Sequence, residues 1–249
     1  MMSLELHSIS KKFGDFTVIR ELNLSIPAGQ RHAIIGPNGA GKTTLFNLIT
    51  GWDVPTSGSI LINGKAPSAQ RPDKITRSGL ARSFQKNTLF ENLTVFENLR
   101  IAAQAFHSSR WSILRSPRCH PDVIQCAEAA GLQMKLGDVF GRSVKALSYG
   151  RKRQLEVALA LCAKPTILLM DEPAAGTSPA ERTYLIDLLQ GLPSSLTMVL
   201  VEHDMDVVFA VSEIVTVLSY GKVLATGSPA AVKNDPSVIA AYLGGRGHA

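Results

Sequence analysis

The residue run that most constrains this chain is Gly36-Pro37-Asn38-Gly39-Ala40-Gly41-Lys42-Thr43, which fits G-x-x-x-x-G-K-[ST] at every fixed position. We expect a short apolar strand at 31–35 before it and a helix at 42–50 after it. Glycines let the backbone curl so that successive N–H groups face one point, and a helix amino end adds positive potential there. The run therefore predicts a phosphate-binding loop in which Lys42 bridges the β- and γ-phosphates and the Thr43 hydroxyl holds Mg²⁺.

A second element is an apolar strand at 166–170 that is followed by two acids, Asp171 and Glu172. An apolar strand that ends in an acid is common, so alone it says little. Together with the loop it gains meaning, because ligand sites of α/β proteins form at the carboxyl ends of their strands. We expect Asp171 to hold Mg²⁺ through water, and Glu172 to polarise the water that attacks the γ-phosphate.

Composition sets the class of protein. At 249 residues, with 45% apolar and 18% charged residues, the chain is predicted to be a folded protein of one large domain, or a core with one smaller subdomain, and not a disordered or fibrous one. No apolar run approaches the ~18 residues of a membrane span, and Glu5 and His7 interrupt the stretch where a signal peptide would be apolar. We therefore expect a soluble chain of cytoplasmic type. The net charge is +6, but the basic triplet 151–153 is predicted to be solvated surface, so no nucleic-acid partner is expected.

The cysteines are Cys119, Cys126 and Cys162, an odd number without C-x-x-C spacing. They predict neither a disulfide framework nor a zinc site, and they favour a reducing compartment.

Strands and helices are expected to alternate at both ends of the chain. We predict strands at 4–9 and 18–26, a hairpin at 59–64, and strands at 166–170, 197–201 and 214–218, with a helix at 179–190 and Gly51 as a helix cap. Between them, helices are predicted at 94–106, 122–130 and 150–163, with a connecting excursion at 107–120. The pattern predicts an α/β fold, a mostly parallel doubly wound sheet with an inserted helical lobe.

A third element, Leu147-Ser148-Tyr149-Gly150-Arg151, precedes the strand at 166–170. It resembles the LSGGQ signature of ATP-binding cassette (ABC) ATPases. The other motifs of that family follow in order: Gln85 matches its Q-loop, His203 its switch histidine and Phe13 its adenine-stacking aromatic residue. Taken alone, His203 would more often be a core or capping histidine, and Phe13 a packing residue. The resemblance covers essentially the whole chain.

The resemblance implies a P-loop NTPase fold in a single nucleotide-binding domain, residues 1–249. Residues 1–86 and 164–249 would form the catalytic core with an N-terminal antiparallel β subdomain, and about 87–163 the helical subdomain. It also implies ATP and Mg²⁺ as ligands, with Thr43, Gln85 and Asp171 on the metal and Glu172, His203 and Gln85 in catalysis. The nucleotide would contact Phe13, Gly36, Pro37, Asn38, Gly39, Ala40, Gly41, Lys42, Thr43, Thr44, Ser148 and Gly150. In this family two cassettes pair head to tail, so that Ser148 and Gly150 reach the partner's ATP.

Several stretches are similar to cassettes of the branched-chain (hydrophobic) amino acid uptake family. They are 79–85 with 89–98, Tyr149 in the signature, 172–176, the tail 235–244 and the excursion 107–120. Three positions depart from the pattern: Arg151 replaces the signature Gln, Ser178 the D-loop Asp or Asn, and Ser212-Glu213 the usual Asp-Arg. The Ser178 departure leads us to expect modest ATP turnover unless a partner cassette supplies a better D-loop.

The resemblance implies transmembrane permease subunits, a second identical or paralogous cassette and, indirectly, a periplasmic or extracellular solute-binding protein. The chain would sit peripherally at the cytoplasmic face of the inner (plasma) membrane. An apolar patch formed by five residues is expected to receive a permease helix: Leu89, Phe90, Leu93, Val95 and Phe96. Leu93 and Phe96 could equally be core residues of the helical lobe. Alternatives are a lipid or lipopolysaccharide exporter, and a soluble ABC ATPase acting on nucleic acid or ribosomes. The solute remains open.

Overall fold

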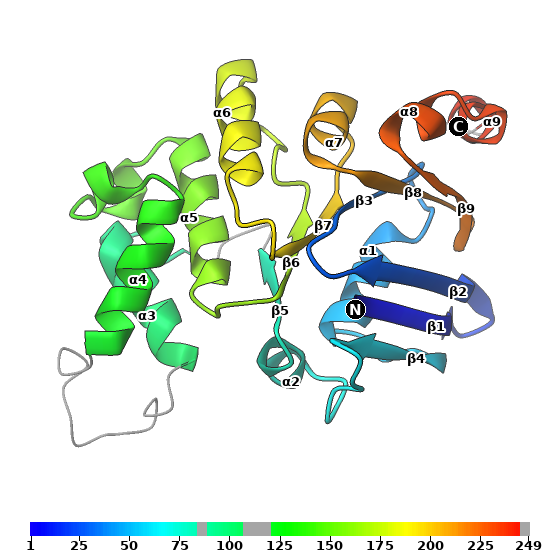
Figure 1. Cartoon of the computed structure of the whole chain (residues 1–249), viewed down its shortest axis with the longest axis horizontal. Coiled ribbons are helices and arrows are strands. Elements are labelled where there is room, and N and C mark those ends of the chain that lie inside the picture. Colours follow the sequence, from blue (N-terminus) through cyan, green and yellow to red (C-terminus); the bar gives the residue numbers. More distant parts are fainter. Residues whose placement is uncertain (84–88, 107–120, 245–249) are drawn as a thin grey trace.

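The computed structural model describes residues 1–83, 89–106 and 121–244, which form two sheets and a group of helices (Figure 1). The larger sheet has the order β5-β6-β7-β3-β8-β9, parallel from β5 to β8 with β9 antiparallel at its edge. Its strands are β3 (Arg31–Ile35), β5 (Leu80–Ser83), β6 (Ile167–Asp171), β7 (Thr197–Val201), β8 (Ile214–Ser219) and β9 (Lys222–Gly227). The predicted α/β fold with a mostly parallel sheet is confirmed.

The smaller sheet is antiparallel with the order β2-β1-β4. Its strands are β1 (Met2–Phe13), β2 (Phe16–Pro27) and β4 (Ser57–Ile62). Helix α1 (Lys42–Thr50) shares one buried apolar cluster with both sheets, in which Phe46 is the largest fully buried side chain. The helix that follows the glycine-rich loop is thus held between the two sheets.

The helical lobe lies at one end of the molecule (Figure 1, left). It contains α3 (Val95–Phe106), α4 (Pro121–Gln133) and α5 (Tyr149–Leu161). The remaining helices are α2 (Pro72–Arg77), α6 (Pro179–Gln190), α7 (Met205–Val211), α8 (Pro229–Lys233) and α9 (Pro236–Gly244), with single 3-10 turns at Gly137–Val139 and Val144–Ala146. Within the described ranges, none of these helices combines the length and apolar character needed to cross a membrane.

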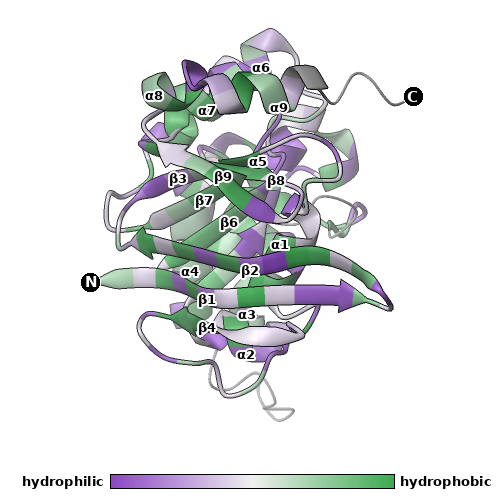
Figure 2. Ribbon diagram, turned by 90° about the vertical axis from the view of Figure 1, so that its right-hand side faces the viewer, coloured by the Kyte–Doolittle hydropathy of each residue, from purple (hydrophilic) through white to green (hydrophobic). Residues whose placement is uncertain are grey.

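Strand β6 shows why the apolar run before Asp171 is unbroken. Ile167 and Leu169 face the cluster of the smaller sheet, whereas Leu168 and Met170 face the cluster of the helical lobe. A parallel strand covered on both faces needs apolar residues at every position, not at alternate ones. Figure 2 shows β6 and β7 coloured as hydrophobic in the middle of the molecule.

The observed boundaries of helices and strands differ from the predicted ones mainly where polar residues interrupt the apolar pattern. Helices 42–50 and 179–190 are as predicted, and Gly51 caps α1 in the left-handed conformation. Strands β1 and β2 extend beyond 4–9 and 18–26, because register shifts between them let polar residues join the pairing. Asn63 and Gly64 both have positive φ, which confirms the turn, but only the single bridge Ile62–Lys65 follows it, so the predicted hairpin lacks a second strand.

Acid should destabilise the fold through His32, which is buried on β3. Its Nδ1 lies 3.0 Å from Gln30 Oε1 and its Nε2 lies 2.8 Å from Thr216 Oγ1. Burial lowers the pKa of His32 from 6.5 to about 4. The unfolded chain therefore binds this proton first as pH falls, so stability is complete above pH 6.5 and is lost towards pH 4. At pH 5 the loss is about 2 kcal/mol.

The measurement is urea unfolding at pH 7 and pH 5, for the native chain and for His32→Gln. The native chain should lose about 2 kcal/mol more than the variant between these two values. Equal losses would show that His32 is not the group responsible.

Candidate nucleotide-binding site

The loop between β3 and α1 requires glycine at two positions. Gly36 has φ 153°, and a Cβ there would lie 2.2 Å from Leu218 O. Gly41 has φ 101°, and a Cβ there would lie 2.7 Å from Ile19 Cδ1. At Gly36 a Cβ would collide with a backbone carbonyl that cannot move aside, and at Gly41 the left-handed φ disfavours any other residue even if the Ile19 side chain shifts. The loop backbone therefore packs directly against β8 and β2, in the strand–loop–helix context that the sequence predicts.

The amino end of α1 is open to an anion. Gly41 occupies the N-cap position and no side chain caps the helix, so backbone N–H groups of the first turn are available. Lys42 is buried, and its Nζ donates to Gly36 O at 2.6 Å and Pro37 O at 3.0 Å. Burial lowers the pKa of Lys42, and the charges of Glu172 and Asp171 oppose that shift. Thr43 is exposed and Thr44 half-buried at the same helix end.

Asp171 ends β6 with its side chain only 4% exposed, and it is paired with an arginine that sequence reasoning missed. Arg82 on β5 places Nη2 2.7 Å from Asp171 Oδ2, and its Nη1 donates to Asn47 Oδ1 on α1 at 3.0 Å. Arg82 thus joins the strand before Gln85 to both the acid and the loop helix. Gln85 itself lies outside the described residues.

Glu172 and His203 come together from two neighbouring strand ends. Glu172 Oε1 lies 2.8 Å from His203 Nε2, although 31 positions separate them in the sequence. Glu172 has φ 47°, in the left-handed region, and its N–H donates to Val201 O at 2.8 Å. A carboxylate and an imidazole in hydrogen-bond contact can hold and move a proton.

Two buried charged residues fix the backbone around Glu172. Arg153 on α5 donates from Nη2 to Glu172 O at 2.7 Å and from Nε to Pro173 O at 3.1 Å. The prediction of a solvated basic triplet is therefore wrong for Arg153, which is 6% exposed, because its guanidinium bonds to these two carbonyls.

Glu202, just after β7, is the second of these residues and was also missed. Its Oε1 accepts from Ala174 N at 2.8 Å, and its Oε2 accepts from His203 N at 2.9 Å and Asp204 N at 3.3 Å. It thereby joins the loop after Glu172 to the loop that carries His203. Glu202 directly follows a buried apolar strand, as Asp171 does in the sequence prediction, so the signal used for Asp171 could have identified it.

Replacing Glu202 by Gln should destabilise the fold by about 1–3 kcal/mol, because the amide NH₂ would face backbone N–H donors and leave them unsatisfied. Urea unfolding measures this loss, and turnover should fall with it because His203 loses its backbone anchor. Glu213→Gln, at an exposed position, is the control and should change stability by about 0.5 kcal/mol or less. Equal effects of the two substitutions would contradict the anchoring role.

The other predicted nucleotide residues lie on β1 and at the start of α5. Phe13 ends β1, is 50% exposed, and lies beneath Lys11 Nζ at 4.8 Å from the ring centre. Ser148 is the N-cap of α5, where its Oγ accepts from Arg151 N at 3.3 Å. Gly150 N donates to Glu181 Oε1 on α6 at 3.1 Å. The contacts of Ser148 and Gly150 are therefore with α5 and α6.

The departures from the family pattern have local partners. Arg151 donates to Lys135 O at 2.7 Å and pairs with Asp138 at 3.0 Å, so it joins α5 to the segment after α4. Ser178 forms a capping box with Glu181 at the start of α6. A serine at this position therefore stabilises a helix end.

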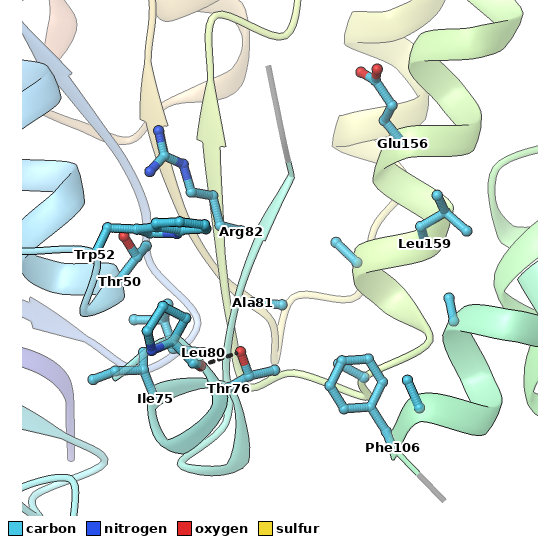
Figure 3. Close-up of a pocket in the computed structure, with 15 residues that line it drawn as sticks. Thr50, Trp52, Ile75, Thr76, Leu80, Ala81, Arg82, Phe106, Glu156 and Leu159 are labelled. Atoms are coloured by element: carbon cyan, nitrogen blue, oxygen red, sulfur yellow. Dashed lines mark hydrogen bonds between the residues drawn. The ribbon is translucent and has the colours of Figure 1, made fainter. Parts of the chain in front are cut away.

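A cavity of about 270 Å³ lies between β5 with α2 on one side and helices α3 and α5 of the lobe on the other. Trp52, 61% exposed, lies on one side of it, and Phe106, 46% exposed, on the other (Figure 3). Arg82 also lines it. The predicted apolar patch is wrong at Val95, which is fully buried in the helical lobe.

Two further members of the predicted patch pack inward as well. Phe96 lies against Phe140 with 5.6 Å between ring centres, and Leu89 also contacts the core of the lobe. Phe90 is exposed and Leu93 half-buried.

Comparison with known proteins places this geometry in a family. The model described as "ABC transporter" matches residues 19–175, and one described as "Branched-chain amino acid ATP-binding cassette transporter" matches residues 222–248. The chain is 36% identical over 248 residues to the high-affinity branched-chain amino acid transport ATP-binding protein BraF of Pseudomonas aeruginosa, covering 97% of each. The same figures hold for the corresponding LivG protein of Escherichia coli K12.

Solved structures agree with the sequence comparisons. A nucleotide-free ATP-binding cassette from an ABC transporter matches with a TM-score of 0.85 and 27% identity, covering 97% of this chain and 99% of that one. The ADP conformation of another such cassette matches with a TM-score of 0.85 and 28% identity, covering 98% of this chain and 99% of that one. The overall fold is thus that of an ATP-binding cassette, and the chain belongs to the ABC transporter family as an ABC-type ATPase.

Proposed function

We propose that this chain is the ATP-binding and ATP-hydrolysing subunit of an importer for branched-chain amino acids or a related small solute. The observation that carries the proposal is its similarity, over 97% of both chains, to two proteins named as branched-chain amino acid transport ATP-binding proteins. The match of residues 222–248 to a branched-chain cassette model supports it independently. Such a subunit works at the cytoplasmic face of the inner membrane with transmembrane permeases, a solute-binding protein acting indirectly and no nucleic acid.

In this proposal the loop from Gly36 to Thr44 cradles the phosphates of ATP and Phe13 stacks on its adenine. Lys42 turns its amine from the Gly36 and Pro37 carbonyls to the β- and γ-phosphates. The Thr43 hydroxyl, the Asp171 carboxylate and the Gln85 amide are an all-oxygen set, which suits Mg²⁺. When bound, Mg²⁺ would neutralise charge on the β- and γ-phosphates.

Hydrolysis in this proposal depends on the Glu172–His203 pair. The Glu172 carboxylate accepts a proton from the attacking water, and His203, 2.8 Å away, orients that carboxylate. Arg153 and Glu202 hold the backbone on either side. The chain's own residues thus supply the base and its support.

Ser148 and Gly150 act in this proposal on the nucleotide of a second cassette. Both lie at the amino end of α5, where N–H groups and the helix dipole favour a phosphate. Their contacts with α5 and α6 leave them on a different part of the chain from the loop at Gly36–Lys42. A head-to-tail pair would bring one chain's signature to the other's loop. The helical subdomain, about 87–163, would then move with its signature.

The cavity between Trp52 and Phe106 is proposed as the surface that receives the permease. It combines exposed aromatic rings with a buried link to the site, since Arg82 lines it and also pairs with Asp171. A permease segment seated there would contact the same side chain that holds the acid. This replaces the patch expected at 89–96.

The test is recovery of partners by a tagged Glu172→Gln chain, trapped with Mg-ATP in its host and solubilised from membranes. Permeases, a second cassette and a solute-binding protein should co-purify. Adding Trp52→Ala should lower permease recovery while the second cassette stays bound. Recovery of lipid-export components, or of ribosomes or DNA from the soluble fraction, would overturn the importer and leave only the ATPase.

A further inference from the structure

Two cysteines that are distant in sequence lie together at the base of the helical lobe. Cys126 is on α4 and Cys162 directly follows α5, 36 positions later. Cys126 Sγ donates to Cys162 O at 3.4 Å, and Cys162 Sγ donates to Leu99 O on α3 at 3.6 Å. Neither of these hydrogen bonds involves a residue of the candidate nucleotide site.

The two thiols differ in access. Cys162 is 2% exposed, whereas Cys126 is half-buried and lines an open cavity of about 350 Å³. The cavity is walled largely by aliphatic side chains, among them Leu161 and Leu196, and Lys164 adds a positive charge. A small reagent can therefore reach Cys126 but not Cys162.

The electrostatic surroundings favour Cys126 as the nucleophile. The adjacent Cys162 side chain lowers the pKa of Cys126, and the charge of Lys164 lowers it further against the effect of burial. The adjacent Cys126 side chain raises the pKa of Cys162, and burial raises it again. A thiolate beside a protonated thiol is the arrangement found where one cysteine reacts and the other resolves.

We propose that Cys126 and Cys162 form an oxidisable pair, in which Cys126 reacts with small hydroperoxides and Cys162 resolves the product. The Cys126 thiolate attacks one peroxide oxygen; an S–O bond forms, the O–O bond breaks, and the second oxygen leaves as water or an alcohol after taking up the proton that Cys126 released on ionising. Cys162 sulfur then attacks Cys126 sulfur, the S–O bond breaks, and hydroxide leaves as water with the Cys162 proton. Both sulfurs are oxidised and one peroxide is reduced.

The resulting bond would tie α4 to the segment that leads into β6. Four residues, Ala163 to Thr166, separate Cys162 from the first residue of β6, and β6 ends in Asp171. Oxidation of the pair would therefore constrain the segment that leads into β6, the strand that carries Asp171.

The test uses the full chain with Cys119→Ser, which removes the third cysteine and leaves the pair intact. Stoichiometric hydrogen peroxide should produce a Cys126–Cys162 disulfide, identified by peptide mass without reductant and reversed by dithiothreitol. Adding Cys162→Ser should leave a sulfenic acid at Cys126 that dimedone traps. Adding Cys126→Ser instead should leave Cys162 unlabelled.

A second measurement needs no substitution in the pair. In the Cys119→Ser chain at pH 7, iodoacetamide should alkylate Cys126 about tenfold or more faster than Cys162. Equal rates, or dimedone on Cys162, would overturn the assignment of the nucleophile. A sulfenic acid that persists while both thiols are present would overturn the resolving role.

Discussion

Glu172→Gln is expected to lower ATP turnover by about 10² or more while Mg-ATP still binds tightly. An amide cannot accept a proton from water, and it removes the charge that lies 2.8 Å from His203 Nε2. The backbone should keep its conformation, because its carbonyl remains bonded to Arg153 and its N–H to Val201 O. Phosphate release and nucleotide binding, measured on the same preparation, separate the two effects.

Glu128→Gln is a matched control for this substitution. Glu128 is an exposed glutamate on α4, and its loss should leave turnover unchanged. Turnover near the native rate in Glu172→Gln would remove Glu172 from the role of base. Loss of binding together with turnover would instead place Glu172 in the binding of ATP.

Lys42→Ala is expected to abolish tight Mg-ATP binding, with affinity falling about hundredfold or more. Charge-assisted hydrogen bonds contribute about 1.5–3 kcal/mol each, and the amine would make two to the β- and γ-phosphates. No other basic side chain bonds to the loop carbonyls in the described structure. Calorimetric titration with Mg-ATP measures the affinity, and thermal unfolding reports whether the fold is kept.

Lys65→Ala removes an equal charge from an exposed turn and should bind Mg-ATP as the native chain does. Unchanged affinity in Lys42→Ala would refute the phosphate-cradle assignment. A chain that no longer unfolds cooperatively would instead show that the Gly36 and Pro37 carbonyls need this amine for folding.

Local signals predicted the elements that local chemistry determines. Gly51 caps α1 as predicted, and Ser178 with Glu181 starts α6, so the observed ends of both helices coincide with local capping residues. The long strands β1 and β2 could not, because their ends depend on pairing across bulges with no apolar pattern. Helix α5 was predicted at 150–163 and runs from 149 to 161, since Ser148 rather than Gly150 begins it.

The residues of the candidate site also fall into those that the sequence could predict and those that it could not. Lys42 could be named as a candidate from the fixed spacing of its motif, Asp171 and Glu172 from their place after an apolar strand, and His203 from the family resemblance. Arg82 and Arg153 could not, because each acts through a partner distant in sequence, and for Arg153 that partner is a backbone group. A backbone carbonyl or N–H leaves no trace in residue identity, so a buried arginine that bonds to one resembles any surface arginine until the chain is folded.

The left-handed conformation of Glu172 has a consequence for how this position can vary. At φ 47° the backbone would favour glycine or asparagine, and a glutamate there costs about 1 kcal/mol or more. Residues branched at Cβ would fit still less well. Random substitution at this position should therefore yield variants that fold better than the native chain yet have lost turnover. At this position a gain in stability would accompany a loss of activity, so a screen for thermal tolerance alone would select against the glutamate.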